Sequence, residues 1–143
     1  MAVLLIRLRA FASSRETILL SNVESMTNRL YSVGMIELVK QKKNEIATLC
    51  RTFQVARLDL FGSAATGKFN PESSDLDFMI EFENRSTPGL LNRYLDFAEA
   101  LEKLFNRHVD LITQHSIRNP YFQKAIAATK EPLYEHRTQT AAP

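Results

Sequence analysis

Several features that would assign this chain to a special class of protein are scarce or absent. Cys50 is the only cysteine, so no disulfide can form within the chain, and a reducing cytoplasm is the expected compartment. No apolar run approaches the roughly 20 residues that a membrane-spanning helix needs. The chain also has no internal repeat and no low-complexity segment. The sequence therefore predicts an ordinary globular protein of the cytoplasm.

The chain also lacks a strong excess of positive or negative charge. The net charge is only +2 at pH 7. Residues 1–34 hold four arginines and two glutamates, so all of this excess lies there and the rest of the chain is neutral. Nucleic-acid-binding proteins more often concentrate basic residues on one face. The composition does not favour a nucleic acid partner.

With 143 residues the chain is long enough for one domain with a hydrophobic core and too short for two. Gly34 separates the Arg-bearing start from the neutral remainder. We therefore expect an N-terminal extension over 1–34, helical from about residue 13, one domain over 35–136 and a tail over 137–143. The extension could even precede the true initiator.

Helical periodicity is visible in four segments, 13–33, 35–53, 89–105 and 119–129. Ser13 and Glu16 have the spacing of a capping box, and Gly34 is a typical residue to end the first helix. Asn119 and Pro120 are suited to begin the last one. Cys50 lies on the apolar side of the second helix, which predicts a small buried side chain rather than a nucleophile.

Three β-rich runs alternate with these helices, at 56–61, 75–82 and 108–113, and Pro132–Tyr134 suggests a short edge strand. A chain with both helices and strands predicts an α/β (mixed α+β) fold.

The most informative stretch is Leu60–Phe82. Asp75 and Asp77 stand one residue apart at the start of a strand-like run, so their side chains project from the same face. Two adjacent carboxylates repel each other unless something positive lies between them. A divalent metal ion is the natural candidate.

Two further features converge on this pair. Gly62 and Ser63 stand where a strand ends and a helical turn begins, and backbone amides at such a turn attract phosphates. Asp110 lies between apolar residues of the third strand. If that strand lies beside the second, Asp110 completes a three-carboxylate cluster, and hard oxygen ligands of this kind suit Mg²⁺.

Each feature also has a simpler interpretation. The Gly-Ser pair is most often only a turn, and Ser74-Asp75-Leu76-Asp77 could be a capped turn before a strand. Asp110 could pair with Arg107 or Lys103. The combination is more specific than any of its parts.

Together these residues resemble the minimal nucleotidyltransferases, within the DNA polymerase beta-like nucleotidyltransferase superfamily, over about Met35–Glu135. The resemblance implies a small mixed β-sheet flanked by helices. It implies that Asp75, Asp77 and Asp110 hold the metal and perform catalysis, with Asp110 as a possible base for the acceptor hydroxyl. It also implies that Gly62 and Ser63 bind the phosphates of the nucleotide. Family members often have an arginine where this chain has Thr66, and Lys68 is the candidate to replace it.

Minimal nucleotidyltransferases are commonly antitoxins paired with a HEPN-domain toxin. The resemblance therefore implies Mg²⁺-dependent transfer of AMP from ATP to a tyrosine of such a partner, in a homo- or hetero-oligomer. The small size of the chain is consistent with an acceptor supplied by a partner. Tyr121 and Phe122 are candidates for the partner surface. A binding antitoxin without catalysis, and an aminoglycoside-type enzyme with a small-molecule acceptor, are the alternatives.

Overall fold

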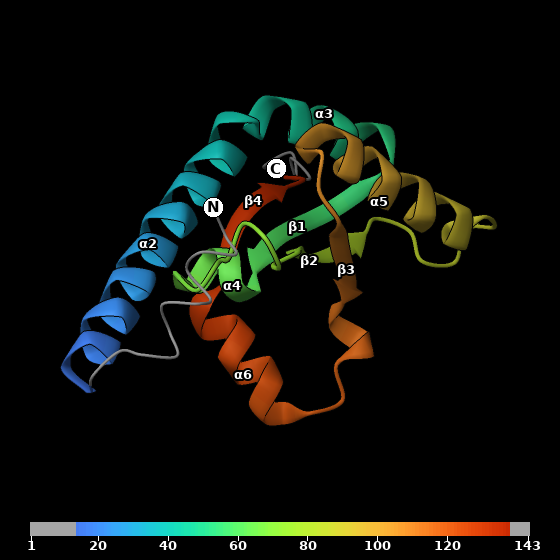
Figure 1. Cartoon of the computed structure of the whole chain (residues 1–143). Coiled ribbons are helices and arrows are strands. Elements are labelled where there is room, and N and C mark those ends of the chain that lie inside the picture. The colour runs from blue at the N-terminus through green and yellow to red at the C-terminus, as the bar shows by residue number, and fades with distance from the viewer. Residues whose placement is uncertain (1–13, 138–143) are drawn as a thin grey trace.

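A four-stranded sheet with strand order β3-β2-β1-β4 forms the centre of the computed structural model, which describes residues 14–137 (Figure 1). Strand β1 is antiparallel to both of its neighbours, β2 and β4, whereas β2 and β3 run parallel. The sheet is therefore mixed, as predicted. The strands are β1 (Val55–Phe61), β2 (Leu76–Phe82), β3 (Val109–Thr113) and β4 (Glu131–Glu135).

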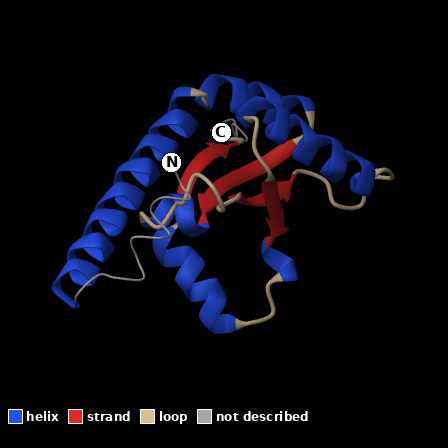
Figure 2. Ribbon diagram, viewed as in Figure 1, coloured by secondary structure: helices blue, strands red, loops and turns tan. Residues whose placement is uncertain are grey.

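Five α-helices and one short 3₁₀ helix connect or flank these strands in the described part of the chain (Figure 2). The Asn119 side chain accepts hydrogen bonds from the backbone N–H groups of Tyr121 and Phe122, which confirms the predicted cap of the last helix. The helices are α2 (Ser14–Gln41), α3 (Lys43–Thr52), α4 (Gly62–Thr66), α5 (Leu90–Phe105), η1 (Gln114–Ser116) and α6 (Pro120–Thr129).

The main core lies between one face of the sheet and helices α3 and α5. Alternate strand residues such as Leu58, Phe78 and Leu111 point into it and meet Ile46 of α3 and Phe97 of α5. The opposite face carries a smaller cluster beside α6, made of Phe61, Met79, Ile117 and Ile126. Figure 1 shows α3 and α5 on one side of the sheet and α6 on the other. That second face is consequently covered only in part.

Cys50 is fully buried in the main core. Burial raises the pKa of its thiol to about 12, so the thiolate does not form near neutral pH. The prediction of a small buried side chain is confirmed.

The prediction that Gly34 ends the first helix is wrong. Helix α2 continues through Gly34 to Gln41. The helical conformation is interrupted at Lys42, and α3 begins at Lys43. Gly34 does not adopt the left-handed conformation of a glycine that ends a helix. Beyond Gly34, Met35, Ile36 and Val39 pack against the core, so tertiary contacts carry the helix past the glycine.

The part of α2 before Gly34 differs from the part after it in the exposure of its apolar side chains. Its described apolar side chains before Gly34 are exposed, and they are Ile18, Leu19, Leu20, Val23, Met26, Leu30 and Val33. The expected capping box of Ser13 and Glu16 and the end of the expected tail lie outside the described side chains. No helix within 14–137 has the length and apolar character needed to cross a membrane.

Strand β3 is an edge strand, and side chains form hydrogen bonds with three of its backbone groups. Glu102 accepts a hydrogen bond from the Val109 N–H, and the Tyr94 hydroxyl donates to the Leu111 carbonyl. Ser116 donates to the carbonyl of Thr113. Side chains that satisfy an edge in this way oppose the addition of a further strand. They also hold β3, which carries Asp110, in a defined position.

We expect Gly34→Ala to stabilise helix α2 by up to about 1 kcal/mol, because alanine is the better residue in a helix interior. A Cβ at Gly34 would meet no atom within 4 Å, so no clash offsets this gain. Hydrogen exchange of the α2 amides and far-UV circular dichroism during heating measure the effect. A helix that ended at Gly34 would give the opposite sign, since alanine is disfavoured in the left-handed conformation.

Candidate active site

The turn after β1 depends on a glycine at position 62. Gly62 has φ +72°, a conformation that residues with a side chain rarely adopt. A Cβ at this position would lie 2.1 Å from the Oδ2 atom of Asp77. Only glycine therefore allows the Asp77 carboxylate to rest against this turn.

The pairing of β2 with β3 brings the predicted carboxylates together. Asp77 and Asp110 are partners in the parallel register, and both project from the face opposite the main core, because Leu76, Phe78, Val109 and Leu111 point into that core. Asp75 immediately precedes β2 and is exposed, as is Asp110. The strand starts one residue later than predicted, so Asp75 belongs to the end of the preceding loop.

The electrostatics of Asp77 reflect this crowding. Burial raises the pKa of its carboxyl above the ordinary value, and the negative charges of Asp110 and Asp75 raise it further. The Ser63 backbone N–H donates a hydrogen bond to the Asp77 carboxylate and acts in the opposite direction. Burial and the repulsion by the two neighbouring acids together outweigh that bond, and no positively charged group contributes to the shift.

The carboxylates of Asp75, Asp77 and Asp110 are the candidate ligands for a metal ion. Their uncompensated carboxylate oxygens are the hard donors that Mg²⁺ requires. Across residues 14–137, however, no three His, Cys, Asp or Glu side chains are arranged so that they could hold a metal together. The donor chemistry thus fits a divalent cation, but the carboxylates would have to move closer around it.

The simpler interpretation of Asp110 is wrong. Arg107 donates its hydrogen bonds to the backbone carbonyls of Ser74 and Pro71, and Lys103 pairs with Glu99 at 2.6 Å. Neither residue forms an ion pair with Asp110 in the described part of the chain. The Asp110 carboxylate is therefore free to take part in the cluster.

The predicted phosphate-binding residues lie on and after the short helix α4. Ser63 is half-exposed, and its backbone N–H is the donor to Asp77. The Thr66 hydroxyl donates to the Gly62 carbonyl at 2.9 Å, so it is bonded within its own helical turn. Lys68 is exposed and forms no ion pair with the described residues. Of these groups, Lys68 has a charge available for an anion.

Sequence reasoning missed a buried charge cluster on the same face of the sheet. Asp59 is 1% exposed and accepts hydrogen bonds from Arg57 Nε at 3.0 Å and Lys130 Nζ at 2.7 Å. Lys130 stands at the end of α6, so this pair ties α6 to β1. The signal was an acid between Leu58 and Leu60, the same pattern that identified Asp110. Its partner Lys130 is too distant in the sequence to be inferred.

Comparison with known proteins now identifies the family. The model of the nucleotidyltransferase domain family matches residues 42–131, which include the Gly62–Ser63 turn and all three acids. The chain belongs to this family. It is thus a nucleotidyltransferase, as the resemblance implied.

Two relatives from Methanocaldococcus jannaschii carry protein adenylyltransferase in their names. One is 45% identical over 74 residues, which cover 52% of this chain and 72% of the relative. The other is 34% identical over 93 residues, which cover 64% of this chain and the whole of the relative. This nucleotidyltransferase therefore shares most of the length of both relatives.

Solved structures show the same fold. A protein described as a minimal nucleotidyltransferase superposes with a TM-score of 0.56 at 28% identity, covering 68% of this chain and 94% of its own. A toxin-antitoxin structure with AMP-PNP superposes with a TM-score of 0.51 at 20% identity, covering 66% of this chain and 74% of its own. At that identity the second likeness concerns the fold alone.

We expect Gly62→Ala to destabilise the nucleotidyltransferase more than Gly67→Ala. Both glycines have φ near +70°, at +72° and +75°, so alanine is strained at either position by about 1 kcal/mol or more. Only at Gly62 does the new Cβ collide with Asp77 and displace it from the Ser63 amide. Urea unfolding of both variants measures the difference. Equal losses would show that the Gly62–Asp77 contact is unimportant.

The raised pKa of Asp77 predicts a pH-dependent effect of Asp77→Asn. The folded state binds the Asp77 proton more tightly than the unfolded state does, so ionised Asp77 lowers stability above its folded pKa. We expect Asp77→Asn to be more stable than wild type at pH 7. This gain should shrink as the pH falls through the folded pKa and vanish below the ordinary value of 3.8. Urea unfolding of the pair across this range tests the sign, and a less stable variant at pH 7 contradicts it.

Proposed function

We propose that this nucleotidyltransferase transfers AMP from ATP to a tyrosine of a partner toxin in an Mg²⁺-dependent reaction, and so acts as an antitoxin. The observation that carries the proposal is the meeting of Asp77 and Asp110 on neighbouring strands, with Asp75 and the Gly62–Ser63 turn beside them. Asp75 and Asp110 are exposed. A side chain on the surface of another protein could therefore reach them.

Each residue has a role in this proposal. Gly62 and Ser63 would lie beside the triphosphate: Gly62 leaves room there for the Asp77 carboxylate, and Ser63, whose amide donates to Asp77, offers its hydroxyl. Asp75, Asp77 and Asp110 would hold the metal, and a bound Mg²⁺ supplies positive charge that neutralises the phosphates. Lys68 would contact the phosphates in place of the arginine that family members often carry.

The chemical step is an in-line displacement at the α-phosphorus of ATP. The tyrosine oxygen forms a bond to this phosphorus while the bond to the β-phosphate oxygen breaks, and pyrophosphate leaves. The resemblance makes Asp110 the group that accepts the hydroxyl proton of the tyrosine, and this acid is exposed and stands opposite Asp77 in the register of β2 and β3.

Two kinds of likeness support the choice of a protein acceptor and a toxin partner. The relatives from M. jannaschii are named for protein adenylyl transfer. One structure of the same fold is a toxin-antitoxin with AMP-PNP. A HEPN-domain toxin is the partner class that the resemblance implied.

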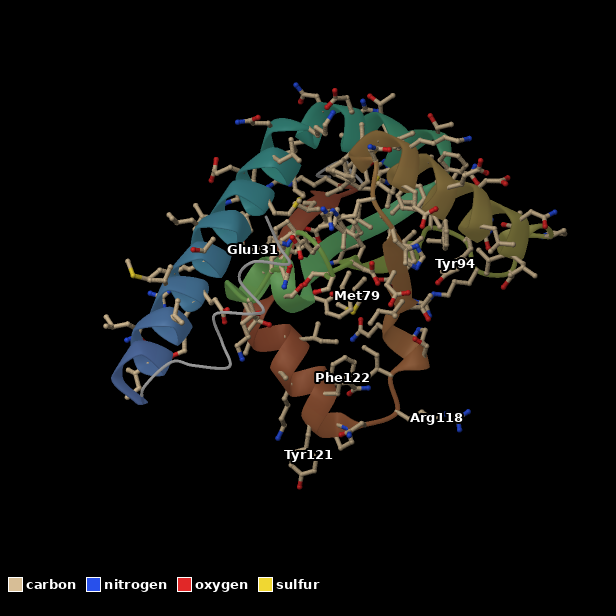
Figure 3. All side chains as sticks on the ribbon, in the orientation of Figure 1. Met79, Tyr94, Arg118, Tyr121, Phe122 and Glu131 are labelled. Atoms are coloured by element: carbon tan, nitrogen blue, oxygen red, sulfur yellow. The ribbon has the colours of Figure 1, made fainter. Side chains whose placement is uncertain are left out.

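The aromatic residues at the start of α6 are candidates for contact with the partner. Tyr121 is 82% exposed and Phe122 48% exposed. Figure 3 shows Tyr121 directed away from the molecule, whereas Phe122 lies on the side of α6 that faces Met79. Tyr121 is consequently not a core residue, and it is the better placed of the two for a partner.

One observation favours a second candidate, an antitoxin that acts by binding alone. Thr66 stands where members of the family often have an arginine, and its hydroxyl donates to the Gly62 carbonyl. Without that arginine, binding of the triphosphate rests on fewer contacts. Catalysis and protection from the toxin can therefore be tested separately.

The test of catalysis uses ATP labelled at the α-phosphate, Mg²⁺ and the protein encoded beside this one. Wild type should label a tyrosine of that protein, and Asp75→Asn/Asp77→Asn should reduce the rate at least about 100-fold, because charge on the transferred group is no longer neutralised. Asp96→Asn is the matched control, since Asp96 is an exposed acid on α5 and should leave the rate unchanged. Mass spectrometry locates the label.

The outcomes separate the candidates. Equal labelling by wild type and the double variant contradicts the enzymatic proposal. Protection of cells by the double variant, without labelling, supports the antitoxin that acts by binding. Labelling of an aminoglycoside or another small hydroxylated compound in the absence of any protein partner points to a small-molecule acceptor.

A further inference from the structure

The loop that ends in Asp75 faces an electrostatic problem. Residues 67–75 form turns and irregular backbone between α4 and β2, and Asp75 is exposed at the end of that loop. The charges of Asp75 and Asp110 both act on Asp77, so the three acids repel one another. A carboxylate on a loop can relieve this repulsion by moving away, unless the loop is held.

Arg107 holds the loop at three points. Its Nη1 donates to the Ser74 carbonyl at 2.9 Å and its Nη2 to the Pro71 carbonyl at 2.8 Å. The guanidinium carbon lies 5.1 Å from the centroid of the Phe69 ring, which is itself buried. Ser74, which Arg107 contacts, is the residue directly before Asp75.

The position of Arg107 links two of the acids. It is three residues before Asp110 and directly before His108, whose carbonyl accepts a hydrogen bond from the Leu76 N–H at 3.1 Å. The segment that leads into β3 is therefore bonded to the chain on both sides of Asp75. Movement of the loop relative to β3 would break these bonds.

We propose that Arg107 is a positioning residue, which sets the place of Asp75 relative to Asp110 and so determines the affinity of the carboxylate cluster for a divalent metal. The inference rests on the proposed function, because it takes the three acids as the metal ligands. Arginine suits the task because its planar fork reaches two carbonyls while its face stacks on a ring. Lysine retains the charge but cannot make all three contacts.

The chain offers a matched control in Arg93. Its guanidinium lies 5.3 Å from the centroid of the Phe82 ring, and its two terminal nitrogens donate to the Gln54 side chain and the Asn84 carbonyl. This arrangement has the same design but lies at the opposite end of β2. Arg93→Lys should therefore cost similar stability without affecting the carboxylates.

The experiment titrates the purified chain with Mn²⁺ as the probe metal and follows free Mn²⁺ by electron paramagnetic resonance. We expect Arg107→Lys to weaken Mn²⁺ binding about 10-fold, as is usual when a residue that orients metal ligands is changed. Arg93→Lys should bind Mn²⁺ as wild type does. Urea unfolding of both variants establishes that each is folded, and hydrogen exchange should rise over residues 68–75 only in Arg107→Lys.

The results distinguish failure of this inference from failure of the proposed function. If wild type binds Mn²⁺ and Asp75→Asn/Asp77→Asn does not, the metal site stands. Unchanged affinity in Arg107→Lys then overturns the positioning role alone. If wild type and the double Asn variant bind Mn²⁺ equally, the metal site and the positioning role fall together. An equal loss of affinity in Arg93→Lys would also overturn the inference, since the effect would then be one of general stability.

Discussion

Repulsion among three carboxylates is the constraint on which the rest of the site depends. The parallel pairing of β2 and β3 places Asp77 opposite Asp110, and the preceding loop adds Asp75. Burial and these neighbours raise the pKa of Asp77, so the fold maintains the cluster at a cost in stability. A protein tolerates such a cluster when the charge has a use, and binding a cation beside phosphates is such a use.

The surrounding structure opposes the dispersal of these acids by several independent means. The Ser63 amide holds Asp77 against Gly62, where no side chain intervenes. Buried Asp59 and Lys130 anchor α6 to β1 on the same face of the sheet. Salt bridges at the surface contribute little to stability. Asp59, however, is buried and is paired with both Arg57 and Lys130, so removal of one partner would leave a costly unpaired charge.

Local patterns predicted most of the elements because their signals are short-range. Alternating apolar residues marked the strands, and the Asn119–Pro120 pair marked the start of α6. The same reasoning was wrong at Gly34, because packing of Met35, Ile36 and Val39 outweighs the weak helix propensity of one glycine. It also missed the role of Asp59, whose partner Lys130 lies 71 residues away.

The sequence by itself determined which chemical groups the candidate site contains, a Gly-Ser turn and two acids one residue apart, since these depend on neighbours along the chain. Only the tertiary structure decided that β3 lies beside β2, that Asp110 therefore joins Asp77, and that Arg107 reaches back to the loop before Asp75. The physical reason is that strand order and side-chain contacts across 30 or more residues follow from packing of the whole core, which no local pattern encodes.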